Sequence, residues 1–234
     1  MQEKEKELQI SISFGLATKT DPKEGIAEIL KKAEDTMYRN KLYEGPSIRG
    51  KILEGIIAAI NAKNPREKQH SQRVSILCRA FGEVLDLESQ EVKKLEIFGL
   101  LHDIGKIAIA DEILNKNGKL TTTETEEIKR HPEIGYRLLC NSNEMSDIAD
   151  YVLSHHERWD GKGYPKGLSG ENIPLFSRIC AIADAFDAMT SERSYRNAQP
   201  TDFALNELQT NAGTQFDPEL VRLFVLHELH HSIQ

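Results

Sequence analysis

Residues 95–107 read LEIFGLLHDIGKI, and they carry the strongest structural signal in the chain. Apolar residues occupy most sides of the helix that this segment would form, so it is expected to lie inside a helical core. The pair His102-Asp103 interrupts the apolar run at the end of the helix. An ionised aspartate on an apolar element is costly unless it is paired or bound to a metal ion. The pair by itself is equally compatible with a hydrogen-bonded histidine beside a capping aspartate.

The chain on both sides of this segment is predicted to be mainly helical. Thr123-x-x-Glu126 has the pattern of a capping box, and Asp217 with Pro218 has the pattern of a helix start. Apolar periodicity and capping signals predict helices over residues 24–42, 47–60, 68–85, 89–102, from 123 onward, 145–156, 174–189, 201–212 and from 218 onward. Residues 110–122 and 160–173 are expected to be loops, and loops between helices often carry functional sites.

The first 45 residues have a different pattern. Residues 8–14, LQISISF, alternate apolar and polar side chains, which is typical of a half-buried strand. One strand and one helix are too little for an independent domain. Gly45 and Pro46 then break the pattern. We therefore predict a domain boundary between residues 45 and 46, and a mainly α domain over residues 46–231.

Composition limits the function classes. Lys and Arg number 30 against 37 Asp and Glu, and the net charge of -7 does not favour a duplex nucleic acid partner. No apolar run approaches the roughly 20 residues that span a bilayer, and the first residues are charged where a signal peptide is apolar. These features predict a cytoplasmic protein without a membrane segment. The cysteines, which lack CxxC spacing, are expected to be reduced packing residues; they are Cys78, Cys140 and Cys180.

Seven histidines and aspartates, the His102-Asp103 pair among them, are candidate metal ligands. They are His70, His102, Asp103, His131, His155, His156 and Asp184. Imidazole and carboxylate ligands without a thiolate suit manganese or ferrous iron better than a structural zinc ion. Seven ligands are too many for one four-coordinate ion. If one carboxylate bridges, the set divides into two sites about 3.5 to 4 Å apart, an arrangement that activates water and binds a phosphoryl group.

Four sequence strings resemble a known family. They are HDIGK (102–106), HPEIGY (131–136), HHERWDGKGYPKGL (155–168) and RICAIADAFDAMTSERSYR (178–196). In order and spacing they resemble the HD-GYP family of bacterial cyclic di-GMP phosphodiesterases. The resemblance implies an HD-domain helical bundle with extra C-terminal helices, and hydrolysis of cyclic di-GMP to linear pGpG, with a further step to GMP left open. It also implies metal ligation by the same seven residues, with Asp103 as the bridge.

The resemblance further implies catalytic and substrate-binding roles. Lys106 is expected to contact the scissile phosphate, and Asp187 is expected to lie beside the metals and to hold a water molecule or Lys106. The residues expected to line the nucleotide pocket or to meet a phosphate or a guanine edge are Tyr164, Pro165, Arg193 and Arg196. Without the resemblance, an ordinary turn and solvated surface side chains would be the better explanation of these residues. His227, His230 and His231 match no motif and are expected at the surface.

The position four residues before His70 bears on the number of metals. Three-metal members of the HD-GYP family have a glutamate there, whereas this chain has Arg66. Two divalent ions are therefore expected, and a third is doubtful. Glu67 lies on the same helical face and could replace that glutamate, stay solvated, or pair with Arg66 or Lys63. Two rival functions stay open: hydrolysis of another nucleotide, and a weakly catalytic cyclic-dinucleotide sensor or docking module.

The N-terminal residues resemble a second family. ISISFGLAT (10–18) and KKAEDTMYRNK (31–41) are similar to the final strand and helix of a GGDEF diguanylate cyclase domain. The cyclase loop and its nucleotide pocket lie upstream of these elements in that family. Residues 1–45 are therefore expected to be an inactive remnant. The expected partners are a cyclic dinucleotide, GGDEF-domain proteins and a second copy of the chain.

Overall fold

The computed structural model describes residues 15–19, 25–27, 29–34, 37, 65–116, 118–140, 145–192 and 198–233. The chain separates into two compact units, Met1–Ile56 and Ile57–Gln234. The strand predicted at residues 8–14 and the helix predicted at 47–60 lie outside the described residues. The predicted boundary between residues 45 and 46 lies there too and stays a prediction.

The described part of the first unit is a short segment packed on a helix. Residues 26–27, 29–34 and 37 are helical, in agreement with the helix predicted over residues 24–42. Gly15 lies so close to this helix that a Cβ atom on it would be 1.9 Å from the carbonyl oxygen of Ala33. Only glycine permits this approach.

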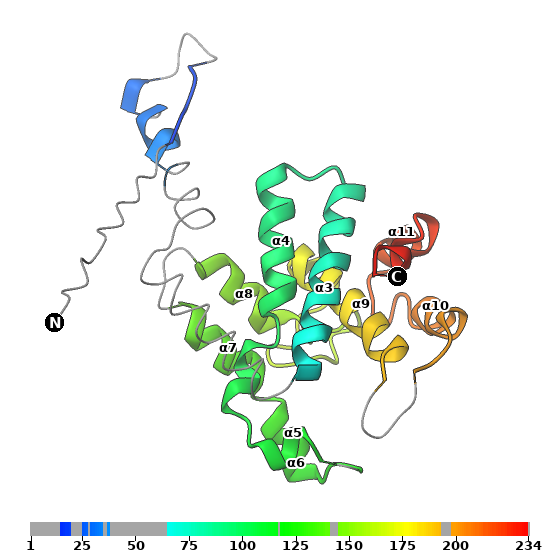
Figure 1. The fold of residues 1–234 in the computed structure, drawn as a ribbon. Coiled ribbons are helices and arrows are strands. Elements are labelled where there is room, and N and C mark those ends of the chain that lie inside the picture. Colours follow the sequence, from blue (N-terminus) through cyan, green and yellow to red (C-terminus); the bar gives the residue numbers. More distant parts are fainter. Residues whose placement is uncertain are drawn as a thin grey trace, which may run out of the picture. The chain divides into compact units, whose positions relative to one another are not determined.

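The second unit is a set of helices joined mostly by short loops (Figure 1). In chain order they are α3 (Pro65–Val84), α4 (Ser89–Leu101), the 3-10 helix η1 (Ile104–Ala108), α5 (Asp111–Leu114), α6 (Thr122–Ile128), α7 (His131–Cys140), α8 (Ser146–Ser154), the 3-10 helix η3 (Gly170–Asn172), α9 (Leu175–Thr190), α10 (Thr201–Thr210), α11 (Pro218–Leu226) and the 3-10 helix η4 (Leu229–Ile233). Within the described residues this unit has no sheet. The prediction of a mainly α domain is confirmed.

The core of this unit lies between α3, α4, α9 and α11. Helix α3 packs along α4 and also contacts α9 and η4. Phe81 of α3 stacks on Phe224 of α11 with ring centroids 5.6 Å apart, and Phe186 of α9 lies 5.2 Å from the same ring. Burying one such side chain contributes about 1.5 to 3 kcal/mol. These contacts hold α3, α9 and α11 together.

Two glycines let neighbouring helices approach closely: Gly99 between α4 and α3, and Gly105 between η1 and α7. A Cβ atom on Gly99 of α4 would lie 2.9 Å from the Cα atom of Ser75 in α3. A Cβ atom on Gly105 of η1 would lie 1.9 Å from the carbonyl oxygen of His131 and 2.7 Å from the nitrogen of Gly135 in α7. Any side chain at Gly105 would therefore force η1 and α7 apart.

The region after α5 differs from the prediction in its register. The capping box of α6 is formed by Thr121 and Glu124: Thr121 Oγ1 accepts from Glu124 N at 3.2 Å, and Glu124 Oε2 accepts from Thr121 N at 2.7 Å. The predicted box at Thr123 and Glu126 is wrong. Both registers contain Thr-x-x-Glu, and the earlier one gains an ion pair because Lys116 Nζ lies 2.6 Å from Glu124 Oε2.

Other predictions of local structure met mixed outcomes. The N-cap at Asp217 is confirmed, since its Oδ1 accepts from Glu219 N at 2.9 Å. The segment 110–122 was expected to be a loop throughout, but it contains the short helix α5. A single helix was expected from residue 123, whereas α6 and α7 are separate helices. No helix among the described residues is long and apolar enough to cross a membrane.

Two expectations about burial are wrong. Cys78 and Cys180 are buried free thiols as expected, but Cys140, the last residue of α7, is exposed. His230 was expected at the surface, yet it is buried with its ring 6.0 Å from that of Phe186. It is covered because η4 packs back against α3. His227 and His231 are exposed, as expected.

Candidate metal centre

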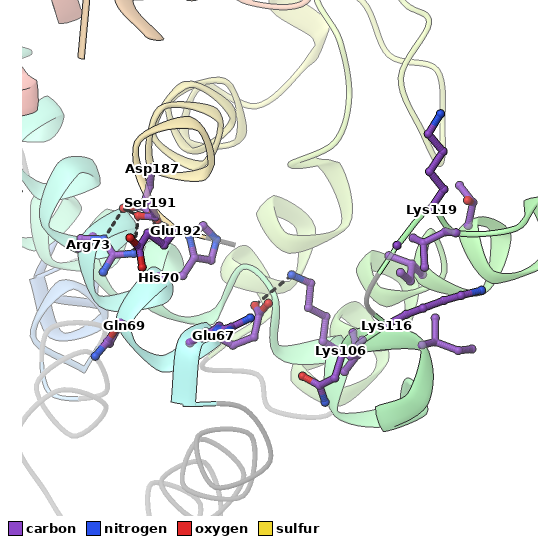
Figure 2. A pocket seen from close by; sticks show the side chains of 18 residues that line it. Glu67, Gln69, His70, Arg73, Lys106, Lys116, Lys119, Asp187, Ser191 and Glu192 are labelled. Atoms are coloured by element: carbon purple, nitrogen blue, oxygen red, sulfur yellow. Dashed lines mark hydrogen bonds and ion pairs between the residues drawn. The ribbon is translucent and has the colours of Figure 1, made fainter. Parts of the chain in front are cut away.

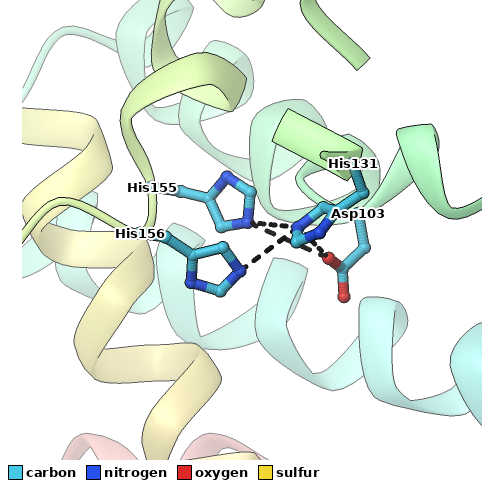
Figure 3. Close-up of side chains that lie close together, drawn as sticks. All are labelled: Asp103, His131, His155 and His156. Carbon is cyan, nitrogen blue, oxygen red and sulfur yellow. Dashed lines mark hydrogen bonds and ion pairs between the residues drawn. The ribbon is translucent and has the colours of Figure 1, made fainter. Parts of the chain in front are cut away.

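The fold brings all seven predicted ligands together in two groups. One group consists of Asp103, His131, His155 and His156, and it is shown in Figure 3. The other consists of His70, His102 and Asp184. Within each group, the candidate ligand atoms all lie within 4.8 Å of one another. Residues up to 114 positions apart in sequence thus form one centre at the adjoining ends of the helices.

Asp103 lies between the two groups. Its Oδ1 is 3.0 Å from Nε2 of His131 and 3.9 Å from Nε2 of His155. Its Oδ2 is 3.1 Å from Nε2 of His102 and 3.8 Å from Nε2 of His70. One oxygen of the carboxylate therefore faces each group, which is the geometry required of a ligand that bridges two cations.

Three of the histidines are oriented by backbone carbonyls. Each donates its Nδ1–H to a carbonyl oxygen in the last turn of the preceding helix, where carbonyls lack partners within the helix. The pairs are His102 with Gly99 at 2.8 Å, His131 with Ile128 at 2.7 Å and His155 with Val152 at 2.6 Å. Because a carbonyl can only accept, Nδ1 carries a proton, and the neutral form of such a ring has its lone pair on Nε2. The three Nε2 atoms thus point towards Asp103 in the orientation that ligands of a cation need.

The arrangement of these nitrogen atoms fits metal ions. Nε2 of His131 lies 3.2 Å from Nε2 of both His155 and His156. Nε2 of His102 is buried and makes no hydrogen bond within the described part of the chain. Converging lone pairs without a donor repel one another, whereas a divalent cation between them would satisfy all of them. Nitrogen and carboxylate oxygen atoms are also the donors that manganese and ferrous iron accept.

The protonation of the histidines differs between the groups. Burial lowers the pKa of His156 to about 4, and the neighbouring His131 adds to this effect. Burial and the charge of His156 likewise hold the pKa of His155 well below its usual value. Burial opposes the charged form of His70 too, but hydrogen bonds with Asp184 and Asp187 outweigh it and raise the pKa of His70 to about 10.

Asp187 was expected to hold a water molecule or Lys106, and the structure contradicts the second of these. Its side chain is 1% exposed. Oδ2 accepts from His70 Nδ1 at 2.7 Å and from Arg73 Nη2 at 3.1 Å, and Oδ1 accepts from Arg73 Nε and from Ser191 Oγ. The carboxylate faces α3, whereas Lys106 lies on η1. Sequence reasoning missed Arg73 entirely.

Lys106 lies against the bridging carboxylate. Its Nζ is 2.6 Å from Oδ2 of Asp103 and 3.0 Å from Oε2 of Glu67. Burial opposes the charged form, but the carboxylates of Asp103 and Glu67 outweigh it and raise the pKa of Lys106. The ammonium group is therefore a fixed cation beside the centre. The pairing of Glu67 with Lys106 was not among the alternatives that the sequence left open.

A cavity of about 1280 Å³ opens beside the centre (Figure 2). His70, Lys106 and Asp187 contribute to its wall. Its basic lining residues come from α3, η1 and the loop between α5 and α6, and they are Arg66, Arg73, Lys106, Lys116 and Lys119. No sequence motif marks Lys116 or Lys119. Three carboxylates also line it, those of Glu67, Asp187 and Glu192, so basic residues are in excess by two. This excess of basic residues suits a substrate that carries phosphate groups.

The loop that follows His156 is held by a buried carboxylate. Glu157 accepts from Lys166 N at 2.7 Å and from Leu168 N at 3.0 Å. Tyr164 stacks on the ring of His156, with centroids 5.0 Å apart and planes at 29°. Pro165, which follows a cis peptide bond, is exposed. Sequence reasoning did not single out Glu157, because its role depends on contacts nine and eleven residues ahead.

Part of the predicted substrate site is not tested by this geometry. Tyr164 and Pro165 are near the centre but are not among the residues that line the cavity. Arg193 and Arg196 lie outside the described residues. Their expected contacts with substrate stay predictions.

A helical bundle that gathers buried histidines and aspartates at one end is the arrangement of a metal-binding domain. The chain belongs to the HD domain family, whose model matches residues 54–220, more than half of its length. This membership agrees with the helical architecture expected from the sequence.

Two curated relatives are similar to this chain over most of its length. The chain is 38% identical over 199 residues to a cyclic di-GMP phosphodiesterase of Thermotoga maritima, which is 83% of this chain and 52% of that protein. It is 44% identical over 171 residues to the cyclic di-GMP phosphodiesterase response regulator RpfG of Xanthomonas campestris pv. campestris, 72% of this chain and 45% of that protein. The chain thus spans about half the length of these curated relatives.

A solved structure supports the fold. The crystal structure of a cyclic GMP-AMP-specific phosphodiesterase of Vibrio cholerae superposes with a TM-score of 0.57 at 23% identity. The match covers 76% of this chain and 49% of that one. At this level of identity, the likeness concerns the fold alone.

Proposed function

We propose that this chain hydrolyses cyclic di-GMP to linear pGpG, with or without a second hydrolysis to GMP. The observation that carries the proposal is the Asp103 carboxylate, with one oxygen facing each of two ligand groups and the Lys106 ammonium 2.6 Å away. The two curated relatives described above, both cyclic di-GMP phosphodiesterases, support the choice of substrate.

The proposed cofactor is a pair of divalent metal ions, manganese or iron, held by the seven ligands. When bound, such ions lower the pKa of a water molecule and offset negative charge on a phosphoryl group. Two ions are favoured over three because Arg66 stands where a further glutamate ligand would be, and because Glu67 is paired with Lys106.

The chain's own residues would orient the substrate. Lys106 would hold a non-bridging oxygen of the scissile phosphate, because its ammonium is fixed and its raised pKa keeps it charged at neutral pH. Tyr164 would stack on a base and Pro165 would line the pocket beside it. Arg193 and Arg196 would bind the second phosphate or a guanine edge. The cavity, whose lining has more basic than acidic residues, would take the body of the dinucleotide.

Product analysis tests this function. The protein is purified without oxygen, loaded with Mn²⁺ or Fe²⁺, and incubated with cyclic di-GMP, and the linear and cyclic forms are separated by chromatography. We expect pGpG to appear only in metal-loaded samples. Competition with cyclic GMP-AMP and guanosine tetraphosphate measures the preference among nucleotides. Metal-loaded protein that yields no linear product would refute the proposal, and preferred turnover of a competitor would change the substrate.

We further propose that residues 1–45 are a fragment of a GGDEF domain without cyclase activity, and that GGDEF-domain proteins or a second copy of the chain act as partners. The resemblance of residues 10–18 and 31–41 supports this. A pull-down with a purified GGDEF-domain protein, together with the mass in solution, tests the two partners.

A further inference from the structure

His70 is oriented differently from the other ligand histidines that have a bonded Nδ1. His102, His131 and His155 donate this hydrogen to backbone carbonyls. His70 lies near the start of α3 and donates instead to the Asp187 carboxylate of α9, at 2.7 Å. Its orientation therefore depends on a side chain from another helix, 117 positions away in sequence.

The Asp187 carboxylate is in turn held by Arg73. The guanidinium donates from Nε to Oδ1 and from Nη2 to Oδ2, the second bond at 3.1 Å. Such paired bonds fix a carboxylate in direction as well as in position. Arg73 and His70 are three residues apart on α3, so both side chains reach Asp187 from the same helical face. Figure 2 shows this cluster at the wall of the cavity.

Ser191 extends the cluster to the end of α9. Its Oγ accepts from Arg73 Nη2 at 2.7 Å, and its backbone nitrogen donates to the carbonyl oxygen of Asp187 at 3.0 Å. The same arginine therefore contacts the carboxylate and the residue that ends the helix. This couples the position of Asp187 to the packing of α9 on α3.

The geometry separates a positioning role for Asp187 from a catalytic one. Both oxygens already accept hydrogen bonds, from His70, Arg73 and Ser191, and the side chain is 1% exposed. A carboxylate that takes a proton from water during catalysis must reach that water. Asp187 instead contacts Nδ1 of His70, whereas Nε2 of the same ring points towards Asp184.

We propose that Arg73 and Asp187 are positioning residues for one half of the metal centre. By fixing the ring of His70, they direct its Nε2 towards Asp184, at 3.2 Å, and Asp103, at 3.8 Å. The inference rests on the proposed two-metal function. The group of His131, His155 and His156 has no contact of this kind with Arg73 in the described structure, so loss of Arg73 weakens one metal site selectively.

The test compares two arginines of the same helix. Arg73→Met removes the clamp, Arg73→Lys keeps the charge but not the paired bonds, and Arg79→Met is the control because Arg79 forms an exposed pair with Glu83 at 2.9 Å. Mn²⁺ is titrated into each metal-free protein without substrate, and electron paramagnetic resonance distinguishes a coupled pair of ions from a single ion.

We expect wild type and Arg79→Met to bind two ions as a coupled pair. In Arg73→Met, one site keeps its affinity and the other weakens by about 10- to 100-fold, as when a group behind a metal ligand is lost. The spectrum becomes that of isolated Mn²⁺ at intermediate concentrations. Arg73→Lys recovers part of the lost affinity, because one hydrogen bond can re-form.

Other results overturn the inference. Unchanged affinity at both sites in Arg73→Met does so, and so does equal weakening of both sites in a variant whose circular dichroism is native. If Arg73→Met does not fold, Asp187→Asn replaces it, and two wild-type affinities in that variant also overturn the inference. Since metal binding is measured without nucleotide, a wild-type protein that binds two ions but leaves cyclic di-GMP intact would refute only the proposed substrate.

Discussion

The two ligand groups both face the Asp103 carboxylate but differ in charge and in the residues that orient their histidines. One combines three imidazoles with a single carboxylate oxygen, and the pKa values of His155 and His156 are lowered. The other contains Asp184, has Asp187 behind it, and raises the pKa of His70 to about 10. Neighbouring sites in one fold thus shift the pKa values of their histidines in opposite directions. Burial dominates in the first group and carboxylates dominate in the second.

The largest expected effect removes what the two groups share. Asp103→Ala deletes the ligand of both proposed metals and leaves the buried Lys106 with only Glu67. We expect cyclic di-GMP turnover to fall below detection and metal content to fall at both sites. Asp147→Ala, an exposed residue of α8, is the control. Mass spectrometry of bound metal and product chromatography measure the outcome, and retention of two ions with normal turnover would contradict a bridging role.

Single histidine variants separate the groups. His131→Ala is expected to empty the first site and His102→Ala the second, each with a loss of affinity beyond the about 10- to 100-fold caused by changes behind a ligand. The remaining site of each variant should keep one ion. Metal titration by equilibrium dialysis measures this. If either variant loses both ions, the two groups do not act as separate sites.

Lys106→Met tests the cation that lies between Glu67 and Asp103. We expect kcat to fall by about 10²- to 10³-fold, because a fixed donor to the phosphate is lost, while two metal ions remain bound. Lys94→Met is a matched control, since Lys94 pairs with Glu91 on α4. Steady-state kinetics with metal analysis provide the measurement. A change in KM alone would show that Lys106 binds the substrate without assisting the chemistry.

The smallest expected effect is the release of a proton when a metal ion binds at the second site. Below pH 10, His70 carries a proton that must leave before Nε2 binds a cation, so affinity at the second site rises with pH up to about 10. His156, whose pKa is about 4, is already neutral at pH 8 and releases none. Calorimetry in buffers of different ionisation enthalpy should detect about one proton released at the second site. His131→Ala should keep this release, and equal release at both sites would contradict the comparison.

The sequence predicts the ligands better than it predicts what surrounds them. HDIGK marks ligands because a histidine and an aspartate interrupt an apolar helix locally, whereas HHERWDGKGYP marks them through its resemblance to the HD-GYP family. The bonds of Asp187 to His70 and of Lys106 to Glu67 join positions 117 and 39 residues apart. Such pairs arise from the packing of α3 against α9 and the end of α4, which no local spacing encodes.

Helix positions show the same limit. The predicted bounds lie within a few residues of the observed ones where a helix has a clear apolar face or cap. These helices are α3, α4, α8, α9, α10 and α11. The break between α6 and α7 was missed, since only Lys129 and Arg130 separate them and neither is a glycine or a proline. The capping box was placed two residues late because Thr121 and Thr123 offer the same pattern.

The contact at Gly105 has a consequence for how this domain can vary. The spacing between Asp103 and His131 depends on one backbone segment lying directly on another, with no side chain between them. Core residues such as Ile148 can therefore be exchanged for others of similar volume with little effect on that spacing. Gly105 itself has no acceptable replacement, so a library of variants selected for metal binding should be nearly invariant there while the surrounding core drifts.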